Sequence, residues 1–229
     1  MSEFLRYSRN KKLISENEQQ KLENFTVAVI GLGGLGGHVS EQLSRLGIGK
    51  LVLIDPDKID ESNLNRQLFA TEKSIGQFKT EAAKERLTQV NSHTECIYYT
   101  EYFSETNADK ILSGVNVVVD AVDNIETRFL LQKICKKSNL PLVHGSIGGW
   151  YGQVCFIAPG DDTLNLIYPD KKVVGVEKEL GNPAFIPAMV ASIEVAEVLK
   201  YVLNKGDLLQ NKMLFIDLLT HDYMVIKLK

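Results

Sequence analysis

Apolar and polar positions change along this chain with the rhythm of an α/β protein. Between residues 25 and 145, short apolar runs that predict buried strands are separated by segments that predict helices. The predicted strands lie near Val27, Leu51, Ile97, Val117 and Leu142. This order predicts a Rossmann-like, doubly wound and mostly parallel sheet.

The pattern changes after residue 145. A strand is predicted at 153–158, then a polar loop through Gly181, and then a helix at 185–203. This helix is apolar around too much of its circumference for a surface helix, so it is expected to be buried or to form an interface. Two closing strands, at 213–217 and 223–228, predict a C-terminal antiparallel extension of the sheet.

The residues before the first strand are polar and prone to form a helix. Ser15 and Glu18 have the spacing of a capping box, which predicts the start of a helix there. We expect one domain over residues 1–229, divided into an N-terminal helical arm at 1–23, a core at 25–145 and a C-terminal extension at 146–229.

A glycine-rich turn follows the first predicted strand. It reads Gly31-Leu32-Gly33-Gly34-Leu35-Gly36 and precedes a helix-like segment at 38–46. Glycines let the backbone approach a phosphate, and the N–H groups of a helix N-terminus attract its charge. Asp55 ends the second strand, 24 residues after Gly31, where an acid can bind ribose hydroxyls. A nucleotide site is favoured over a turn that only packs a strand against a helix.

The residues after Asp55 favour a triphosphate over a nicotinamide. Two cations follow it, Arg66 and Lys79, together with carboxamides at Asn63, Asn65 and Gln67. A surface ion pair for Arg66 and a solvated helical face for Lys79 are the alternative interpretations. Asp123 follows the β-branched run at 117–122, at the carboxyl end of a strand, where ligands bind in open α/β sheets.

With these residues in order, the chain resembles the ubiquitin-activating-like adenylating superfamily, the ThiF/MoeB/HesA adenylyltransferases. The resemblance covers nearly the whole chain. It rests on five motifs: Gly31 to Gly36, Asp55-x-Asp57, Asn63-Leu-Asn-Arg-Gln67, Gly76-Gln-x-Lys79 and Asp120-Ala-Val-Asp-Asn124. It implies ATP- and Mg²⁺-dependent adenylation of the C-terminal glycine of a small ubiquitin-like sulfur-carrier protein ending in Gly-Gly. Pyrophosphate is released, in sulfur transfer of the thiamine or molybdopterin type.

The resemblance also implies roles for single residues. Arg66 and Lys79 would bind the phosphates and Asp123 the magnesium ion. Arg9 would reach across the interface of a homodimer to the partner's ATP. The implied nucleotide-binding residues are Gly31, Gly33, Gly34, Gly36, Asp55, Asp57, Asn63, Arg66, Gln67, Lys79, Asp123 and Asn124.

The three cysteines depart from the pattern of many family members. Cys96, Cys135 and Cys155 form no Cys-x-x-Cys pair, which excludes a four-cysteine zinc site. Residues 161–172 are therefore expected to be held by packing alone or to be mobile. Cys135 and Cys155 are interpreted as core residues. Because no cysteine follows Cys155, the resemblance implies an acyl-adenylate that passes to another protein, with a sulfur donor as the candidate.

Composition narrows the choice of partner and compartment. The net charge is −3, from 26 basic and 29 acidic residues, and there is no basic block, which argues against a nucleic-acid partner. No apolar run of membrane-spanning length and no signal peptide is recognised, so a cytoplasmic protein is expected. His144 is interpreted as structural, because a carboxylate substrate is already ionised at neutral pH. Trp150 and Tyr151 are candidates to line a groove for the carrier tail.

Three alternatives stay open. A nicotinamide-dependent oxidoreductase would not use the cluster of Asn63, Gln67 and Lys79. A noncatalytic scaffold of the same fold would have no chemical need for Asp55, Arg66, Lys79 and Asp123. Within the adenylating class, an enzyme resembling a tRNA threonylcarbamoyladenosine dehydratase would activate a tRNA-bound carboxylate, which the absence of a basic block disfavours.

Overall fold

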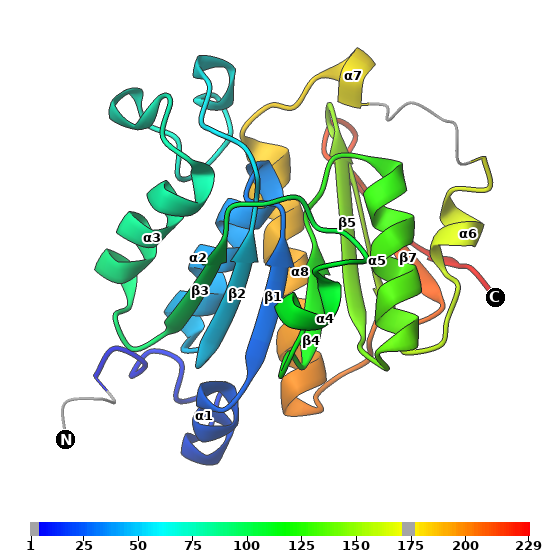
Figure 1. Cartoon of the computed structure of the whole chain (residues 1–229). Helices are drawn as coiled ribbons and strands as arrows, with labels where there is room; N and C mark the ends of the chain where they lie inside the picture. Colours follow the sequence, from blue (N-terminus) through cyan, green and yellow to red (C-terminus); the bar gives the residue numbers. More distant parts are fainter. Residues whose placement is uncertain (1–4, 171–176) are drawn as a thin grey trace.

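Eight strands form one sheet in the part of the chain that the computed structural model describes, residues 5–170 and 177–229. The strand order is β3-β2-β1-β4-β5-β6-β7-β8 (Figure 1). The first five are parallel: β1 (Thr26–Ile30), β2 (Lys50–Ile54), β3 (Glu95–Tyr99), β4 (Val117–Asp120) and β5 (Leu142–Gly148). The others are antiparallel: β6 (Tyr151–Ile157), β7 (Lys212–Asp217) and β8 (Asp222–Lys227). The predicted fold class is confirmed.

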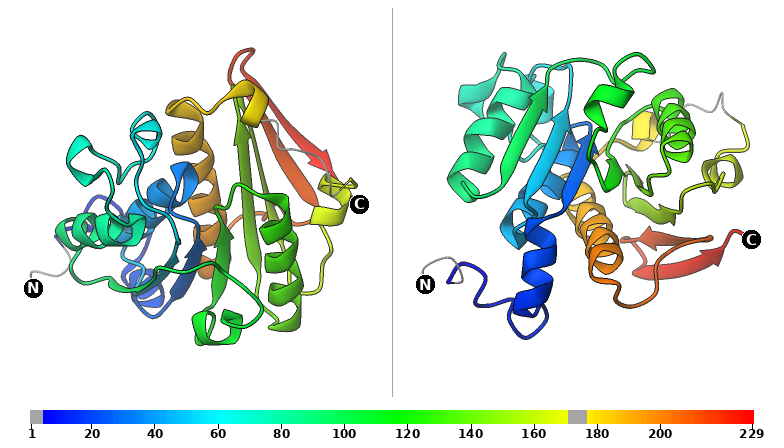
Figure 2. Two further views of the ribbon diagram at one scale, coloured as in Figure 1. Left: turned by 45° about the horizontal axis from the view of Figure 1, so that its top comes forward. Right: turned by 60° about the horizontal axis from the view of Figure 1, so that its bottom comes forward.

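Helices cover both faces of the parallel strands (Figures 1 and 2). On one face, α2 (Gly34–Leu46), α3 (Lys79–Val90) and α8 (Phe185–Leu203) share an apolar core with Val29, Val119 and Val143. On the other face, α4 (Ala108–Ile111) and α5 (Ile125–Lys137) share a second core with Ile30 and Val118. Consecutive strand residues face opposite sides, so strands without polar alternation are buried on both.

The helix predicted at 185–203 is present with the same bounds as α8, and one side of it is buried in the core. Ile186, Val190 and Val198 are fully buried, and the helix lies against α2, β5 and β6. Pro187 lies in its first turn, where a missing N–H costs little. No helix among the described residues is long and apolar enough to cross a membrane.

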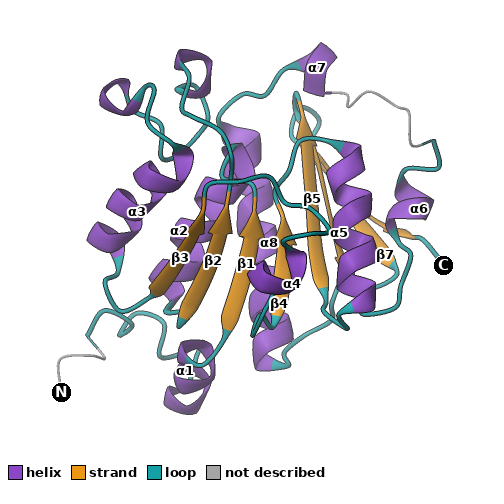
Figure 3. Ribbon diagram, in the orientation of Figure 1, coloured by secondary structure: helices purple, strands orange, loops and turns teal. Residues whose placement is uncertain are grey.

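The helices of the structure differ from the sequence prediction in several segments (Figure 3). The helix expected from residue 38 begins at Gly34, so the glycines form its first turn. The polar loop before Gly181 contains the short helices α6 (Leu164–Ile167) and α7 (Glu177–Leu180). Helices this short leave no periodic pattern in a sequence. The remaining helical turns, each of 3₁₀ type, are η1 (Glu61–Asn63) and η2 (Glu72–Ser74).

In the described part of the predicted N-terminal arm, residues 5–23, α1 (Glu16–Glu23) is helical and residues 5–14 form turns. The capping box is present, since the Ser15 hydroxyl accepts from the Glu18 N–H and a Glu18 carboxylate oxygen accepts from the Ser15 N–H. The buried Tyr7 and Ile14 attach the turns to the core.

The prediction for residues 161–172 falls partly outside the described residues, because these end at residue 170 and resume at 177. The described part is attached to α5. Lys136 pairs with Asp162 at 2.7 Å, and the Leu164 N–H donates to Gln132 Oε1 at 2.7 Å. Polar contacts therefore hold this segment in addition to packing.

A buried carboxyl group lies between α8 and the sheet. Glu194 has no solvent exposure, and neither of its carboxyl oxygens has a hydrogen-bond partner among residues 5–170 and 177–229. It fits only because residue 145 is glycine, where a Cβ would lie 2.5 Å from the Glu194 carboxyl carbon. Burial raises the pKa of Glu194 well above its usual value, and the nearby Asp120 raises it further.

The raised pKa makes stability depend on pH. The unfolded chain loses the Glu194 proton near pH 4.5 and the folded chain keeps it, so unfolding becomes easier by about 1.4 kcal/mol per pH unit between the two pKa values. Glu194→Gln has no carboxyl group to titrate at this position. The difference in free energy of unfolding between this variant and the wild type should therefore grow in favour of the variant from pH 5 to pH 7. Denaturant unfolding at each pH measures the gain, with Glu72→Gln on the exposed η2 as control. A gain that does not change with pH would contradict the assignment.

Candidate active site

A cavity of about 480 Å³ opens at the carboxyl ends of the parallel strands. It is lined by the ends of β1, β2 and β4 and by the N-termini of α2, α3 and α5. The chain runs from β1 through β2 to β3 on one side and continues at β4 on the other, so β1 lies where the strand order reverses. Open α/β sheets bind their ligands at such a point.

The glycine turn forms one wall of the cavity. Gly31 has a φ of +96°, and a Cβ there would lie 2.6 Å from the Ala121 carbonyl oxygen, so only glycine fits between β1 and β4. Gly36 lets the helix pack on the Gly31 carbonyl and does not line the cavity. Gly33 and Gly34 do line it. No side chain caps α2, so its first N–H groups can bind an anion.

Asp55 connects this turn to the end of β2. Its Oδ2 accepts the Leu32 N–H at 2.7 Å and its Oδ1 accepts the Asp57 N–H at 2.8 Å. Asp55 is 4% exposed and lines the cavity. Burial raises the pKa of Asp55, and Lys79 opposes this rise. The remaining lone pairs of the carboxylate can accept hydroxyl protons of a ligand.

Lys79 is the first residue of α3 and is 8% exposed, so the interpretation as part of a solvated helical face is wrong. Its Nζ lies 2.8 Å from Asp57 Oδ2 and 3.5 Å from Asp55 Oδ1. Its backbone N–H donates to the Asp57 carbonyl at 3.0 Å. The ammonium group is thus fixed at the cavity between two carboxylates.

The segment after η1 supplies Arg66 and Gln67, which both line the cavity. Arg66 Nη1 donates to the Ser62 carbonyl at 2.9 Å and to Asn65 Oδ1 at 2.8 Å. Asn63 does not line the cavity. Its side chain caps η1, with Oδ1 accepting the Asp60 N–H at 3.1 Å.

Asp123 and Asn124 line the opposite side, between β4 and α5. Asn124 caps α5 by accepting the Thr127 N–H at 2.8 Å. Asp123 is exposed to the cavity. The described residues contain no group of three or more metal-ligating side chains. A single hard carboxylate beside an anion-binding turn suits Mg²⁺, which commonly takes one or two carboxylates together with phosphate oxygens.

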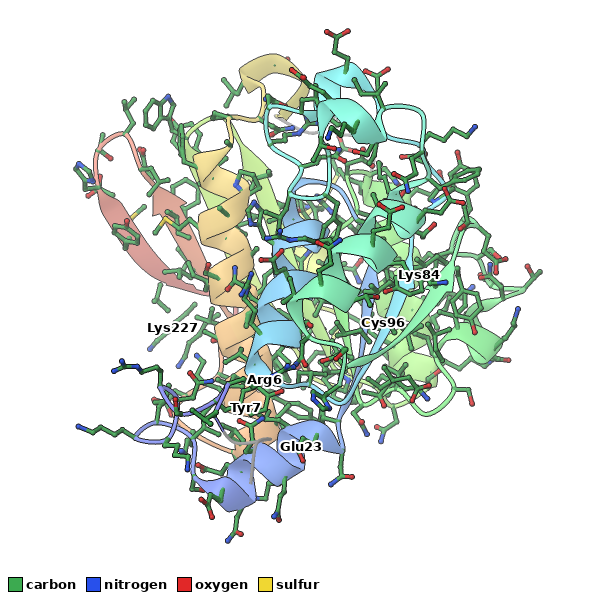
Figure 4. The ribbon with its side chains drawn as sticks, turned by 90° about the vertical axis from the view of Figure 1, so that its left-hand side faces the viewer. Arg6, Tyr7, Glu23, Lys84, Cys96 and Lys227 are labelled. Carbon is green, nitrogen blue, oxygen red and sulfur yellow. The ribbon has the colours of Figure 1, made fainter. Side chains whose placement is uncertain are left out.

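Arg9 lies outside this arrangement. It is exposed in the turns before α1, and α1 leads into the amino end of β1, whereas the cavity lies at the carboxyl ends. Figure 4 shows its neighbours Arg6 and Tyr7 beside Glu23 at that far end. Arg9 therefore does not reach the cavity of its own chain.

Some residues at the cavity were not predicted. They are Glu101, Tyr102 and Phe103 after β3, Arg128 on α5, Ile147 on β5 and Asn182 before α8. Arg128 follows the Asp120 to Asn124 motif on the next helical turn, and this spacing was the only sequence signal among them. His144 is fully buried and bonded to Asp120, in agreement with the structural interpretation.

The sequence is similar to those of known proteins. A sequence model of the ThiF family matches residues 7–229. The chain is 31% identical over 217 residues to the SAMP-activating enzyme E1 of Haloferax volcanii, covering 93% of this chain and 80% of that protein. It is 32% identical over 234 residues to the adenylyltransferase and sulfurtransferase MOCS3 of Drosophila virilis, covering 99% of this chain and 52% of that protein. It thus spans about half the length of MOCS3.

Two solved structures share the fold. Escherichia coli MccB with ATP superposes with a TM-score of 0.80 at 25% identity, covering 98% of this chain and 71% of that one. E. coli tRNA N6-threonylcarbamoyladenosine dehydratase, TcdA, superposes with a TM-score of 0.74 at 25% identity, covering 88% and 95%.

The fit at Gly31 can be tested by adding a methyl group. Gly31→Ala should destabilise the fold by about 1–3 kcal/mol more than Gly160→Ala, because overpacking adds to the backbone strain. Gly160 is a matched control, with a φ of +95° and nothing within 4 Å of a Cβ. Denaturant unfolding measures both variants. Equal losses would show that the contact with Ala121 is not limiting.

Proposed function

This chain belongs to the ThiF family of E1-like adenylating enzymes, and on that basis we propose that it adenylates a small ubiquitin-like sulfur-carrier protein. ATP would activate the C-terminal glycine carboxylate of a carrier that ends in Gly-Gly, with release of pyrophosphate. The observation that carries the proposal is the cavity where Gly33, Gly34, Asp55, Lys79 and Asp123 meet. The names of the haloarchaeal and MOCS3 relatives support the choice of substrate.

The residues divide between the parts of the nucleotide. Asp55 would accept the ribose hydroxyls, and the N–H groups at Gly33 and Gly34 would donate to phosphate oxygens. The cavity has a volume of about 480 Å³, within the usual range for small-molecule sites. Tyr102 and Phe103 line it after β3 and offer aromatic surface to the base.

Catalysis would depend on charge rather than on proton transfer. The carrier carboxylate is ionised at neutral pH, so it needs no general base. Arg66 and Lys79 would neutralise the phosphates while the carboxylate approaches, and hold the reacting groups in line. Asp123 would hold Mg²⁺, which supplies further neutralisation of phosphate charge when bound.

The cysteines support an acyl-adenylate as the final product of this chain. Cys135 is 2% exposed and Cys155 is fully buried. Burial raises the pKa of Cys135 to about 12 and raises that of Cys155 further from neutrality. Burial also raises the pKa of the half-buried Cys96, so none of the three thiols is a ready nucleophile at neutral pH. A second protein, such as a sulfur donor, would take over the acyl group.

The position of Arg9 supports action in a homodimer, since it lies away from the cavity of its own chain. The edge strand β8 exposes Tyr223 (51%), Met224 (49%) and Val225 (58%), which a second subunit could cover. This apolar edge is unusual for a strand that stays in water.

A second candidate is a dehydratase that activates a tRNA-bound threonylcarbamoyl carboxylate. The observation in its favour is the likeness to TcdA, which extends over 95% of that chain. Nucleotide binding would be the same in both cases, so only the carboxylate substrate separates them.

Ligand-dependent stability tests the nucleotide before any carrier is known. ATP with Mg²⁺ at about 100 times its dissociation constant should stabilise the fold by roughly 2.7 kcal/mol, and NAD or NADP at the same concentration should not. Thermal unfolding with each ligand measures this. Stabilisation by a dinucleotide in place of ATP would instead indicate an oxidoreductase.

Catalysis is tested by substitution at Lys79. Lys79→Ala should reduce carrier-dependent exchange between ATP and pyrophosphate by at least about 100-fold, because a charge that stabilises the transition state is lost. Lys84→Ala is the matched control, since Lys84 lies on the exposed face of the same helix (Figure 4). Near-normal exchange by Lys79→Ala would refute the site. Exchange driven by threonylcarbamoylated tRNA and not by carriers would favour the second candidate.

A further inference from the structure

A buried polar network lies beneath the Asp123 side of the cavity. It connects Asp120 at the end of β4, His144 on β5, Arg128 on α5 and Tyr168 directly after α6. Asp120 and His144 have no solvent exposure, and Arg128 is 7% exposed. Since buried polar groups without partners are costly, a connected network of this kind has one favoured geometry.

The Tyr168 hydroxyl is the centre of the network. It lies 2.7 Å from Gln153 Nε2, 3.1 Å from Arg128 Nη1 and 3.0 Å from His144 Nε2, with Ser146 Oγ farther away at 3.3 Å. Gln153 Nε2 and Arg128 Nη1 can only donate, so they occupy both acceptor positions of the hydroxyl. Its own proton is directed toward His144 Nε2 and, over the longer distance, toward Ser146 Oγ.

His144 is hydrogen-bonded to Asp120 through its other ring nitrogen. Burial lowers the pKa of His144, and so its ring is neutral. The hydrogen-bond network assigns the remaining ring proton to Nδ1, which donates to Asp120 Oδ2 at 2.7 Å. Tyr168, His144 and Asp120 are thereby linked by donors and acceptors that match at every step.

The network ends at the peptide groups of Val122. Asp120 Oδ1 accepts the Val122 N–H at 3.1 Å, and Arg128 Nη2 donates to the Val122 carbonyl at 2.9 Å. The Val122 carbonyl is therefore held by Arg128, a direct partner of Tyr168, and the Val122 N–H by Asp120, which connects to Tyr168 through His144. The next residue along the chain is Asp123, whose side chain faces the cavity.

We propose that Tyr168 is a positioning residue, which holds the Val122 backbone through Arg128 and through His144 and Asp120, and so fixes Asp123 toward a nucleotide-bound Mg²⁺. The proposal rests on the proposed function for the role of Asp123. Arg128 is held twice by Tyr168, since its guanidinium carbon also lies 5.7 Å from the centre of the tyrosine ring. Removing the hydroxyl would remove the contact that Arg128 and Gln153 each make with it.

The test compares Tyr168→Phe with Tyr201→Phe. Tyr201 lies on α8 with its ring against Phe25 and Phe156, away from the network, so its variant controls for loss of a hydroxyl. Thermal stabilisation of the whole chain is measured with ATP alone and with ATP plus increasing Mg²⁺. We expect Tyr168→Phe to keep the stabilisation by ATP alone and to need about tenfold more Mg²⁺ for half of the further shift, as for other side chains that orient a metal ligand.

A second measurement separates positioning from general destabilisation. In an Asp123→Asn background, Tyr168→Phe should cause no further change in Mg²⁺ dependence, because both substitutions act through one carboxylate. An additive effect, or an unchanged Mg²⁺ midpoint in Tyr168→Phe alone, would overturn the proposal. If Tyr168→Phe does not fold, the Mg²⁺ midpoint of Arg128→Lys is measured instead. Lysine lacks the two-pronged guanidinium that donates to Val122 and Tyr168 at the same time. A wild type without any response to ATP would instead refute the proposed function.

Discussion

The buried carboxylate of Asp55 joins three parts of the chain that are distant in sequence. One oxygen holds the glycine turn through the Leu32 N–H, and the other holds the Asp57 N–H and lies 3.5 Å from the Lys79 ammonium. The end of β2, the start of α2 and the start of α3 are therefore fixed by one side chain. The glycine turn and Lys79, which are both proposed to bind phosphate, depend on this arrangement.

Two ionisable side chains, Lys79 and Glu194, are buried in different surroundings. Lys79 is buried with two carboxylates beside it, and their attraction offsets the cost of removing its charge from water. Glu194 is buried without a hydrogen-bond partner in the described part of the chain and remains protonated far above its usual range. The first arrangement lies at the cavity, and the second lies inside the core.

The sequence predicted best what depends on local periodicity. The apolar runs placed the strands from β1 to β5, and the apolar helix was predicted with its bounds because its composition changes sharply at both ends. The site motifs located Asp55 and Lys79 but not the contact between them, which depends on how β2 and α3 meet. Tyr168 carried no signal, because its role arises from partners up to 40 residues away that only the sheet brings together. Asn63 matched a motif, yet its side chain is used to cap η1.

The pairing of Lys79 with Asp57 has a consequence for selectivity among nucleotides. Under the proposed function, a phosphate in the cavity would compete for the ammonium with Asp57, whose side chain is 55% exposed and can turn into water. Part of the attraction of the first phosphate is therefore spent on separating this pair, whereas later phosphates meet a cation already released. Under the proposed function, the site would therefore favour a polyphosphate chain over a single phosphate, which would help a mononucleotide product to leave.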